Sequence, residues 1–438
     1  MHRVFCFLCL IFATADVFAQ TYSLQQCIDS AAARNIPVKQ AGLLTEAAAV
    51  NWKQARANLL PDLNASVNHN INSGRSIDPF TNTYVTQSVN AASYGISSGV
   101  VVFNGLTLQH LVRQNAYAYH ASKMEWQQSR DELVLNVILS YLQVLNSEDQ
   151  LQLALRQAQT SQQAVARLRV MDSMGAIRPS DLSDLRGQLM NDELSILNAR
   201  TQLETNKLNL SQLMNKAYDP GMRLERIDTG EFFTAYPSGP AEVYNQALDR
   251  FAQVKAVELR KKSAQYALKS VRGQLYPTLT LGGGINTNYS SLAKDATGKI
   301  PYGSQLTNNR FSSFGLGLNI PIFNSFAVRN RIRLADITVR NNELVEENTK
   351  RLLLQQIDQA YLNMTNAYDR YRLLLQQTGA YQESFRAAEA RFNAGVGTSI
   401  DYLTAKDRLD RANVNLVNAR YDFVLRKKIL DYYAGTKD

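Results

Sequence analysis

The chain has 438 residues, 45% of them hydrophobic and 19% charged, and a formal net charge of +9. Beyond residue 20 it has no apolar run of about 18 residues, so the sequence predicts no membrane-spanning helix. Basic residues are scattered among acidic ones rather than clustered, which is typical of solvated helix faces with ion pairs. We therefore expect no nucleic-acid partner.

Residues 1–19 have the pattern of a secretory signal peptide. Arg3 precedes an apolar run, and the segment ending at Ala19 supplies small residues for cleavage. Two of the three cysteines, Cys6 and Cys9, belong to this segment. The mature chain would keep only Cys27, which cannot form an internal disulfide and is expected to be buried and inert.

The rest of the chain is one long unit written twice. Gly95 recurs as Gly315, 220 positions later, and Tyr141 recurs in the same way as Tyr361. A period of this length is too long for a solenoid repeat of about 20–50 residues. It predicts a gene duplication whose two copies pack as pseudo-equivalent halves.

The first repeat, residues 20–215, is predicted to contain a helix, two strands and a long helical hairpin. Pro61 ends the first helix, because proline cannot continue a helix and also disfavours helical geometry in the residue before it. Alternating sequence then predicts strands separated by a long polar loop. The expected bounds are a helix at about 23–59, strands at about 61–73 and 89–103, a helix at about 106–174, and a tip at about 175–181 before the returning helix.

A linker at 216–240, rich in proline and glycine, precedes the second repeat, residues 241–438. The same order of elements is expected there, with Pro277 ending the first helix. The expected bounds are a helix at about 241–275, strands at about 277–290 and 310–323, and a tip at about 395–401 between two long helices.

The returning helices carry apolar residues at every seventh position. Helices of this length with such a heptad pattern are predicted to fold back as antiparallel coiled-coil hairpins. The residues in this register are Leu182, Leu189, Ile196, Leu203 and Leu210 in the first repeat, and Tyr402, Leu409, Leu416, Phe423 and Leu430 in the second.

Four long strands per chain are too few to close a sheet on themselves. A sheet in lipid must close, because open edges leave backbone groups unpaired. Natural lipid-facing barrels have at least about eight strands. If the strands face lipid, several copies of the chain must pool them.

Taken in order, these features resemble the family of TolC-like outer-membrane efflux proteins over essentially the whole mature chain. The resemblance is carried by the duplicated helix–strand–strand–helix unit and by four short motifs, each weak alone. They are Leu-Pro-Asp-Leu at 60–63 with Tyr-Pro-Thr-Leu at 276–279, Phe-Asn-Gly at 103–105, and a glycine six residues before an aspartate at 175–181 and 395–401.

The resemblance implies an α+β membrane protein located in the outer membrane. It implies a homotrimer whose copies each contribute four strands to a 12-stranded β-barrel, and whose helical hairpins form a periplasmic α-barrel. It also implies an exit duct of a tripartite efflux or secretion system, with a periplasmic adaptor protein and an inner-membrane pump, proton-driven or ATP-driven, as partners.

The resemblance places lumen-facing carboxylates at the hairpin tips, here Asp401 and Asp181. The family's second carboxylate of the second repeat is replaced by Thr404. A ring of carboxylates would attract cations and repel anions. Each aspartate could instead simply cap its helix. Gly175, Gly395 and Gly397 allow tight turns at the tips, where the family contacts its adaptor.

Enzymatic chemistry is not expected. His69, His110 and His120 have no metal-ligand spacing, and neither a nucleophile motif nor a nucleotide loop is present in the sequence. We expect no catalytic residue, metal or cofactor. The alternative function is a soluble periplasmic coiled-coil adaptor or scaffold, which explains the heptads but leaves the four alternating strands unexplained.

Overall fold

The computed structural model describes residues 21–78, 81–175, 178–227, 236–296 and 298–435. The predicted signal peptide lies outside the described residues. Contacts divide the chain into two units. Unit 1 comprises residues 1–41, 126–251 and 351–438, and unit 2 comprises residues 42–125 and 252–350.

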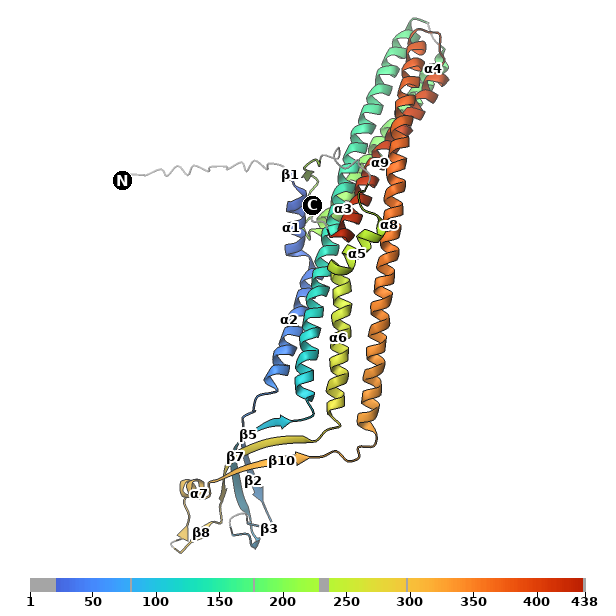
Figure 1. The fold of residues 1–438 in the computed structure, drawn as a ribbon. Coiled ribbons are helices and arrows are strands. Elements are labelled where there is room, and N and C mark those ends of the chain that lie inside the picture. The colour runs from blue at the N-terminus through green and yellow to red at the C-terminus, as the bar shows by residue number, and fades with distance from the viewer. Residues whose placement is uncertain (1–20, 79–80, 176–177, 228–235, 297, 436–438) are drawn as a thin grey trace, which may run out of the picture. The chain divides into compact units, whose positions relative to one another are not determined.

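Unit 2 contains one antiparallel sheet of four long strands, in the order β10-β7-β5-β2 (Figure 1). Both repeats contribute two strands, and the repeats meet where β5 pairs with β7. A bulge lies between Val101 and Phe103 of β5. The strands are β2 (Asn64–Asn72), β5 (Val89–Phe103), β7 (Thr278–Ser290) and β10 (Phe311–Asn319). We expected the last strand to reach residue 323, but it ends before Pro321, which has no amide hydrogen to donate to a ladder.

The segments between paired strands hold further structure that the sequence did not predict. The first contains the hairpin β3 (Arg75–Ile77) and β4 (Tyr84–Thr86); the second contains β8 (Lys294–Asp295), β9 (Gly298–Lys299) and α7 (Tyr302–Asn308). The hydroxyl of Ser290 donates to the buried carboxylate of Asp78 at 2.5 Å, and Gln305 accepts from the Ser290 amide at 2.9 Å. The two segments are therefore bonded to each other through Ser290.

The helix before each strand pair is interrupted, where we expected one continuous helix. In the first repeat α1 (Leu24–Arg34) and α2 (Ile36–Ala57) are separated at Asn35, which has extended backbone and accepts from the Val38 amide through its side chain. Asn35 thus ends one helix and caps the next. In the second repeat α5 (Pro240–Arg250) and α6 (Ala252–Gly273) are separated at Phe251, also extended.

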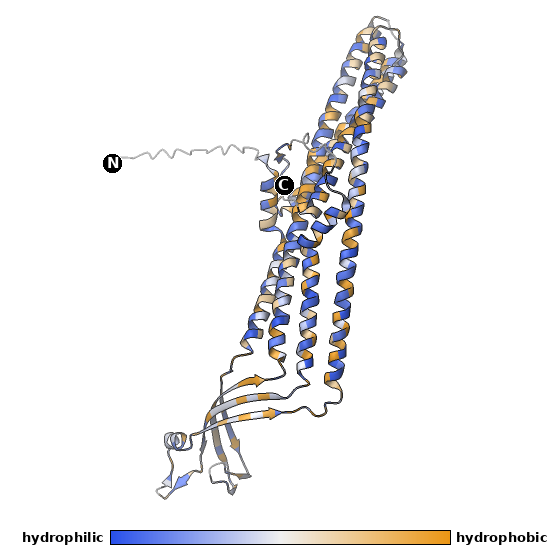
Figure 2. Cartoon of the chain, in the orientation of Figure 1, coloured by the Kyte–Doolittle hydropathy of each residue, from blue (hydrophilic) through white to orange (hydrophobic). Residues whose placement is uncertain are grey.

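Long helices make up the remainder of each repeat, and their bounds follow the sequence offset. Helices α3 (Thr107–Ser173) and α8 (Ala327–Asn393) have 67 residues each. The returning helices are α4 (Pro179–Leu213) and α9 (Ser399–Ala434). Hydrophobic and hydrophilic residues alternate along these helices (Figure 2). Each residue of the predicted heptad register is buried or half-buried, as a coiled-coil seam requires.

The main core of unit 1 lies where both repeats meet the short parallel pair β1 (Thr21–Tyr22) and β6 (Arg223–Leu224). Tyr141 of α3 is fully buried there, and its hydroxyl is hydrogen bonded to the backbone oxygens of Tyr22 and Glu225. Burial raises the pKa of this phenol, so it stays a neutral donor. Cys27 is a free, fully buried cysteine of the same core, and burial raises the pKa of its thiol to about 11.

Candidate functional site at the hairpin tips

The two hairpin tips in unit 1 turn on glycines with left-handed backbone. Gly175 follows α3 with a φ of 68°, and Gly395 follows α8 with a φ of 72°. A side chain at either position would be strained by the backbone, although each has open space around it. Both are predicted tip residues, and the structure places them immediately after the long helices, where glycine commonly ends a helix.

Gly397 is constrained by space instead. A Cβ atom there would lie 3.0 Å from the backbone nitrogen of Phe392. The amides of Val396 and Gly397 both donate to the carbonyl oxygen of Arg391, each at 3.1 Å. The chain thus folds back directly onto the last turn of α8, and a side chain at Gly397 would fit only if this backbone shifted by a few tenths of an ångström.

Asp401 lies in the exposed first turn of α9. Its amide donates to the hydroxyl oxygen of Thr398 at 3.2 Å, and the Thr398 hydroxyl donates to its carboxylate at 2.8 Å. Thr398 is the cap of α9, and a carboxylate in the first turn also interacts favourably with the helix dipole. The Asp401 carboxylate therefore holds the hydroxyl of the Thr398 cap in place.

Asp181 is positioned differently, because it bonds to the other repeat. The buried hydroxyl of Ser399 lies 2.7 Å from its carboxylate and 3.3 Å from that of Asp184. The first turn of α4 is in this way joined to the first turn of α9. We did not single out Asp184 from the sequence. Its spacing of three residues from Asp181 could have indicated it, since the equivalent position in the second repeat is Thr404.

A small apolar core lies between the tips. Tyr402 of α9 is 2% exposed, and its ring stacks on Phe392 with a centroid distance of 4.9 Å. Burial raises the pKa of Tyr402 to about 12. The other buried members of this core come from α3 and α4 and are Val165, Leu168, Leu182 and Leu185.

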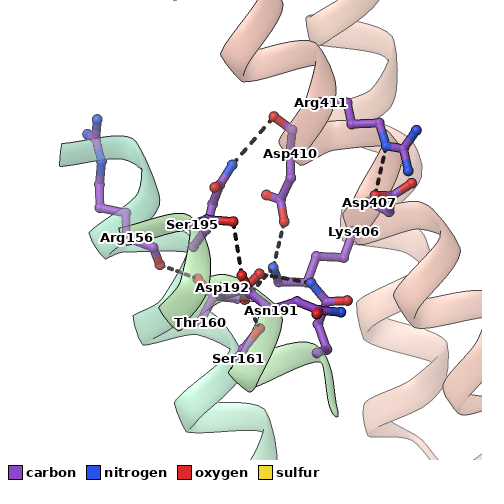
Figure 3. A network of polar contacts seen from close by, with 12 residues as sticks. Arg156, Thr160, Ser161, Asn191, Asp192, Ser195, Lys406, Asp407, Asp410 and Arg411 are labelled. Carbon is purple, nitrogen blue, oxygen red and sulfur yellow. Dashed lines mark hydrogen bonds and ion pairs between the residues drawn. The ribbon is translucent and has the colours of Figure 1, made fainter. Parts of the chain in front are cut away.

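A buried charge cluster lies further along the hairpins, away from the tips (Figure 3). Lys406 of α9 is 2% exposed, and its Nζ lies 3.0 Å from Asp192 of α4 and 2.5 Å from Asp410. Asp192 also accepts from the hydroxyl of Ser161 on α3 at 2.5 Å. Burial raises the pKa of Asp410, while the attraction of Lys406 opposes that rise. The cluster joins three helices of both repeats.

Sequence reasoning missed this cluster. The spacing of Lys406 and Asp410, four residues apart on a helix, looks like an ordinary surface pair. Nothing in the sequence indicates that Asp192, in the other repeat, comes within hydrogen-bond distance of Lys406.

Among the described residues no group of three or more His, Cys, Asp or Glu side chains could hold a metal ion. No described helix is both long enough and apolar enough to cross a membrane.

The fold and the tips define a class of α+β protein to which known channels also belong. Its features are a duplicated chain, long helical hairpins, strands that pair across the repeats, and charged tips. The profile of the family "Outer membrane efflux protein" matches residues 27–216 and 243–436. The chain therefore belongs to this family. It is an outer-membrane efflux channel protein and not an enzyme, and membership implies a trimer that works with efflux pumps.

Individual relatives agree with this assignment. Outer membrane protein TolC of Escherichia coli is 22% identical over 422 residues, covering 95% of this chain and 83% of the relative. TolC of Vibrio cholerae is 24% identical over 390 residues, covering 87% and 83%.

Solved structures of similar fold include the channel CusC and the Neisseria gonorrhoeae outer membrane channel MtrE. CusC matches with a TM-score of 0.81 at 17% identity, covering 94% of this chain and 91% of that one. MtrE matches with a TM-score of 0.79 at 19% identity, covering 94% and 88%. These likenesses show the fold.

Proposed function

We propose that the chain forms a homotrimeric exit duct that carries substrates across the outer membrane. An adaptor protein in the periplasm and a pump in the inner membrane would deliver these substrates to the duct. The strands of three copies would close one common barrel in the lipid. The long hairpins would form a helical tube on the periplasmic side, with the tips at its entrance.

The single observation that carries this proposal is the sheet of unit 2. Its outer strands, β2 and β10, are exposed along their whole length. On β10 the exposed side chains include Phe314, Leu316 and Leu318, which are 79%, 68% and 62% exposed. In water, an open strand edge is unfavourable because it can pair with other chains and aggregate. A large exposed apolar patch is also unfavourable in water. Edge pairing with further copies and burial in lipid remove both penalties together.

The tips are the proposed entrance of the duct. Asp181, Asp184 and Asp401 would give three-fold sets of carboxylates around a narrow opening, which attract cations and repel anions. The turns at Gly175, Gly395 and Gly397 are the proposed docking region for the adaptor. The bonds from Ser399 to Asp181 and Asp184 support a closed arrangement of the tips within one chain.

The test is the mass and the conductance of the full chain purified in detergent. Light scattering should give three chains per particle, and the particle should open conducting pores in a planar bilayer. Recovery of a monomer with intact strands from detergent-free periplasmic extract would overturn the proposal and favour a soluble scaffold.

A further inference from the structure

The duplication can be used to locate contacts that a single chain cannot make. In a closed ring of repeats, one rotation carries the first repeat onto the second. The same rotation carries the second repeat onto the first repeat of the next chain. Each contact between repeats within one chain then has a counterpart between chains, with both residue numbers displaced by 220. This reasoning rests on the proposed trimer.

Within unit 1, one seam between the repeats is polar and well defined. Asp149 of α3 forms an ion pair with Arg420 of α9 and accepts from the hydroxyl of Tyr421 at 2.9 Å. Asn146 and Gln150, on the same face of α3, donate to the side chain of Asn418 at 3.1 and 2.7 Å. The seam is partly shielded, since the Asp149 side chain is only 12% exposed.

The displaced positions repeat the chemistry of this seam. Asp149 becomes Asp369 on α8, and Arg420 becomes Arg200 on α4, so the displaced pair again consists of a carboxylate and a guanidinium. The amide pair is kept as well, because Asn146 and Asn418 become Asn366 and Asn198. The two remaining replacements preserve a donor: Thr201 stands for Tyr421, and Arg370 stands for Gln150.

The displaced residues are exposed where their counterparts are covered. Leu142 of α3 is 2% exposed, whereas Leu362 of α8 is 56% exposed. Val417 of α9 is half-buried, whereas Leu197 of α4 is 59% exposed. In the part of the chain that the structure describes, Asp369 and Arg200 are also exposed, and neither is in an ion pair. One surface on α8 and one on α4 thus have the composition of a seam but no partner.

We propose that α8 of one copy packs against α4 of the next copy in the register that places Asp369 beside Arg200 and Asn366 beside Asn198. The partner is a second copy of this chain. The interface is heterologous, so three copies close a ring in which seams within chains alternate with seams between chains.

The two kinds of seam differ nearer the tips. The buried pair of Lys406 and Asp192 has Arg186 and Ala412 at the displaced positions, so its ion pair is not repeated between chains. The register is therefore carried by the segment around Asp369 and not by the charge cluster of Figure 3.

Disulfide crosslinking tests the register. In a Cys27→Ala background, the full chain with Asn198→Cys and Asn366→Cys, purified in detergent and oxidised, should give covalent dimers and trimers on a non-reducing gel. The matched control is Asn146→Cys with Asn418→Cys, the equivalent pair within one chain, which should close without linking chains. Each single-cysteine variant, and Asn198→Cys with Gln376→Cys, about 15 Å further along α8, should give no trimer ladder.

The outcomes separate this register from the proposed function. A chain that is trimeric by light scattering but gives no ladder for the pair at 198 and 366 would overturn the register alone. A monomeric chain would overturn both. Charge reversal gives an independent measurement: Arg200→Asp and Asp369→Arg should each lower the temperature at which the trimer dissociates, and the double variant should recover most of the loss. If the double variant instead loses as much in dissociation temperature as the two single variants added together, the pairing is contradicted.

Discussion

Ser399 donates a hydrogen bond to Asp181 at 2.7 Å, although the two residues lie in different repeats. The bond joins the first turns of α4 and α9, and Asp184 lies within reach of the same hydroxyl. Ser399 is buried, and its replacement would remove the donor shared by both aspartates. The contact is therefore a specific restraint between the first turns of α4 and α9.

Replacing Ser399 by alanine should loosen the tips. A hydrogen bond to a charged acceptor contributes about 1.5–3 kcal/mol, so Ser399→Ala should raise the open probability or the conductance of single channels in planar bilayers. Thr398→Ala is the matched control, since it removes the α9 cap without touching Asp181. Equal conductance changes in the two variants would mean that helix capping, and not the bond between repeats, holds the tips.

Asp401→Asn separates the charge of Asp401 from its hydrogen bond with the Thr398 cap. The amide oxygen can still accept from the Thr398 hydroxyl, so the cap should survive while the negative charge is lost. Block of the channel by multivalent cations should weaken, measured as a shift of the half-blocking concentration to higher values. An unchanged block would remove Asp401 from the constriction and leave it only its hydrogen bond with the Thr398 cap.

Lys406→Met should be strongly destabilising. The substitution leaves the carboxylate of Asp192, 8% exposed, without its buried cation. Removing one partner of a buried ion pair costs about 3–5 kcal/mol. Unfolding followed by circular dichroism at 222 nm would measure this cost. Arg411→Met is the control, because its pair with Asp407 is exposed and should be worth at most about 1 kcal/mol.

The stability contributed by Asp410 should depend on pH in an unusual direction. Burial raises its pKa above the ordinary value of 3.8, so the folded chain binds this proton more tightly than the unfolded chain. Ionised Asp410 therefore weakens the fold at neutral pH, and the penalty is relieved as pH falls through the raised pKa. As the pH is lowered, the free energy of unfolding of the natural chain should therefore rise relative to that of Asp410→Asn. A difference independent of pH would contradict the raised pKa.

Two glycines should respond to alanine in opposite directions. Gly397→Ala places a methyl group 3.0 Å from the backbone nitrogen of Phe392 and should cost about 1–3 kcal/mol. Gly187 lies within α4 with nothing nearby, so Gly187→Ala should stabilise by about 0.5–1 kcal/mol. Thermal unfolding of both variants would measure the two effects. A loss of stability in both would indicate that the α4 surface at Gly187 is covered by a partner.

The duplication, the long helical hairpins and the family could all be predicted from the sequence alone. These features depend on local periodicity and on proline and glycine signals, which the chain carries at the same offset in both repeats. The returning heptads are an example: from Leu182 to Leu210 and from Tyr402 to Leu430, each position faces other helices in the structure. The short breaks at Asn35 and Phe251 were missed, because two helices separated by one extended residue keep almost the same apolar pattern.

The contacts between residues of the two repeats could not be predicted and are known from the folded chain. The pairing of Lys406 with Asp192, of Arg420 with Asp149 and of Ser399 with Asp181 joins positions more than 200 residues apart. Periodicity assigns a residue to a helix face, but it does not specify which turn of another helix lies opposite. That choice depends on the packing of whole helices. It determines whether an aspartate bonds to the cap of its own helix, as Asp401 does, or to the other repeat, as Asp181 does.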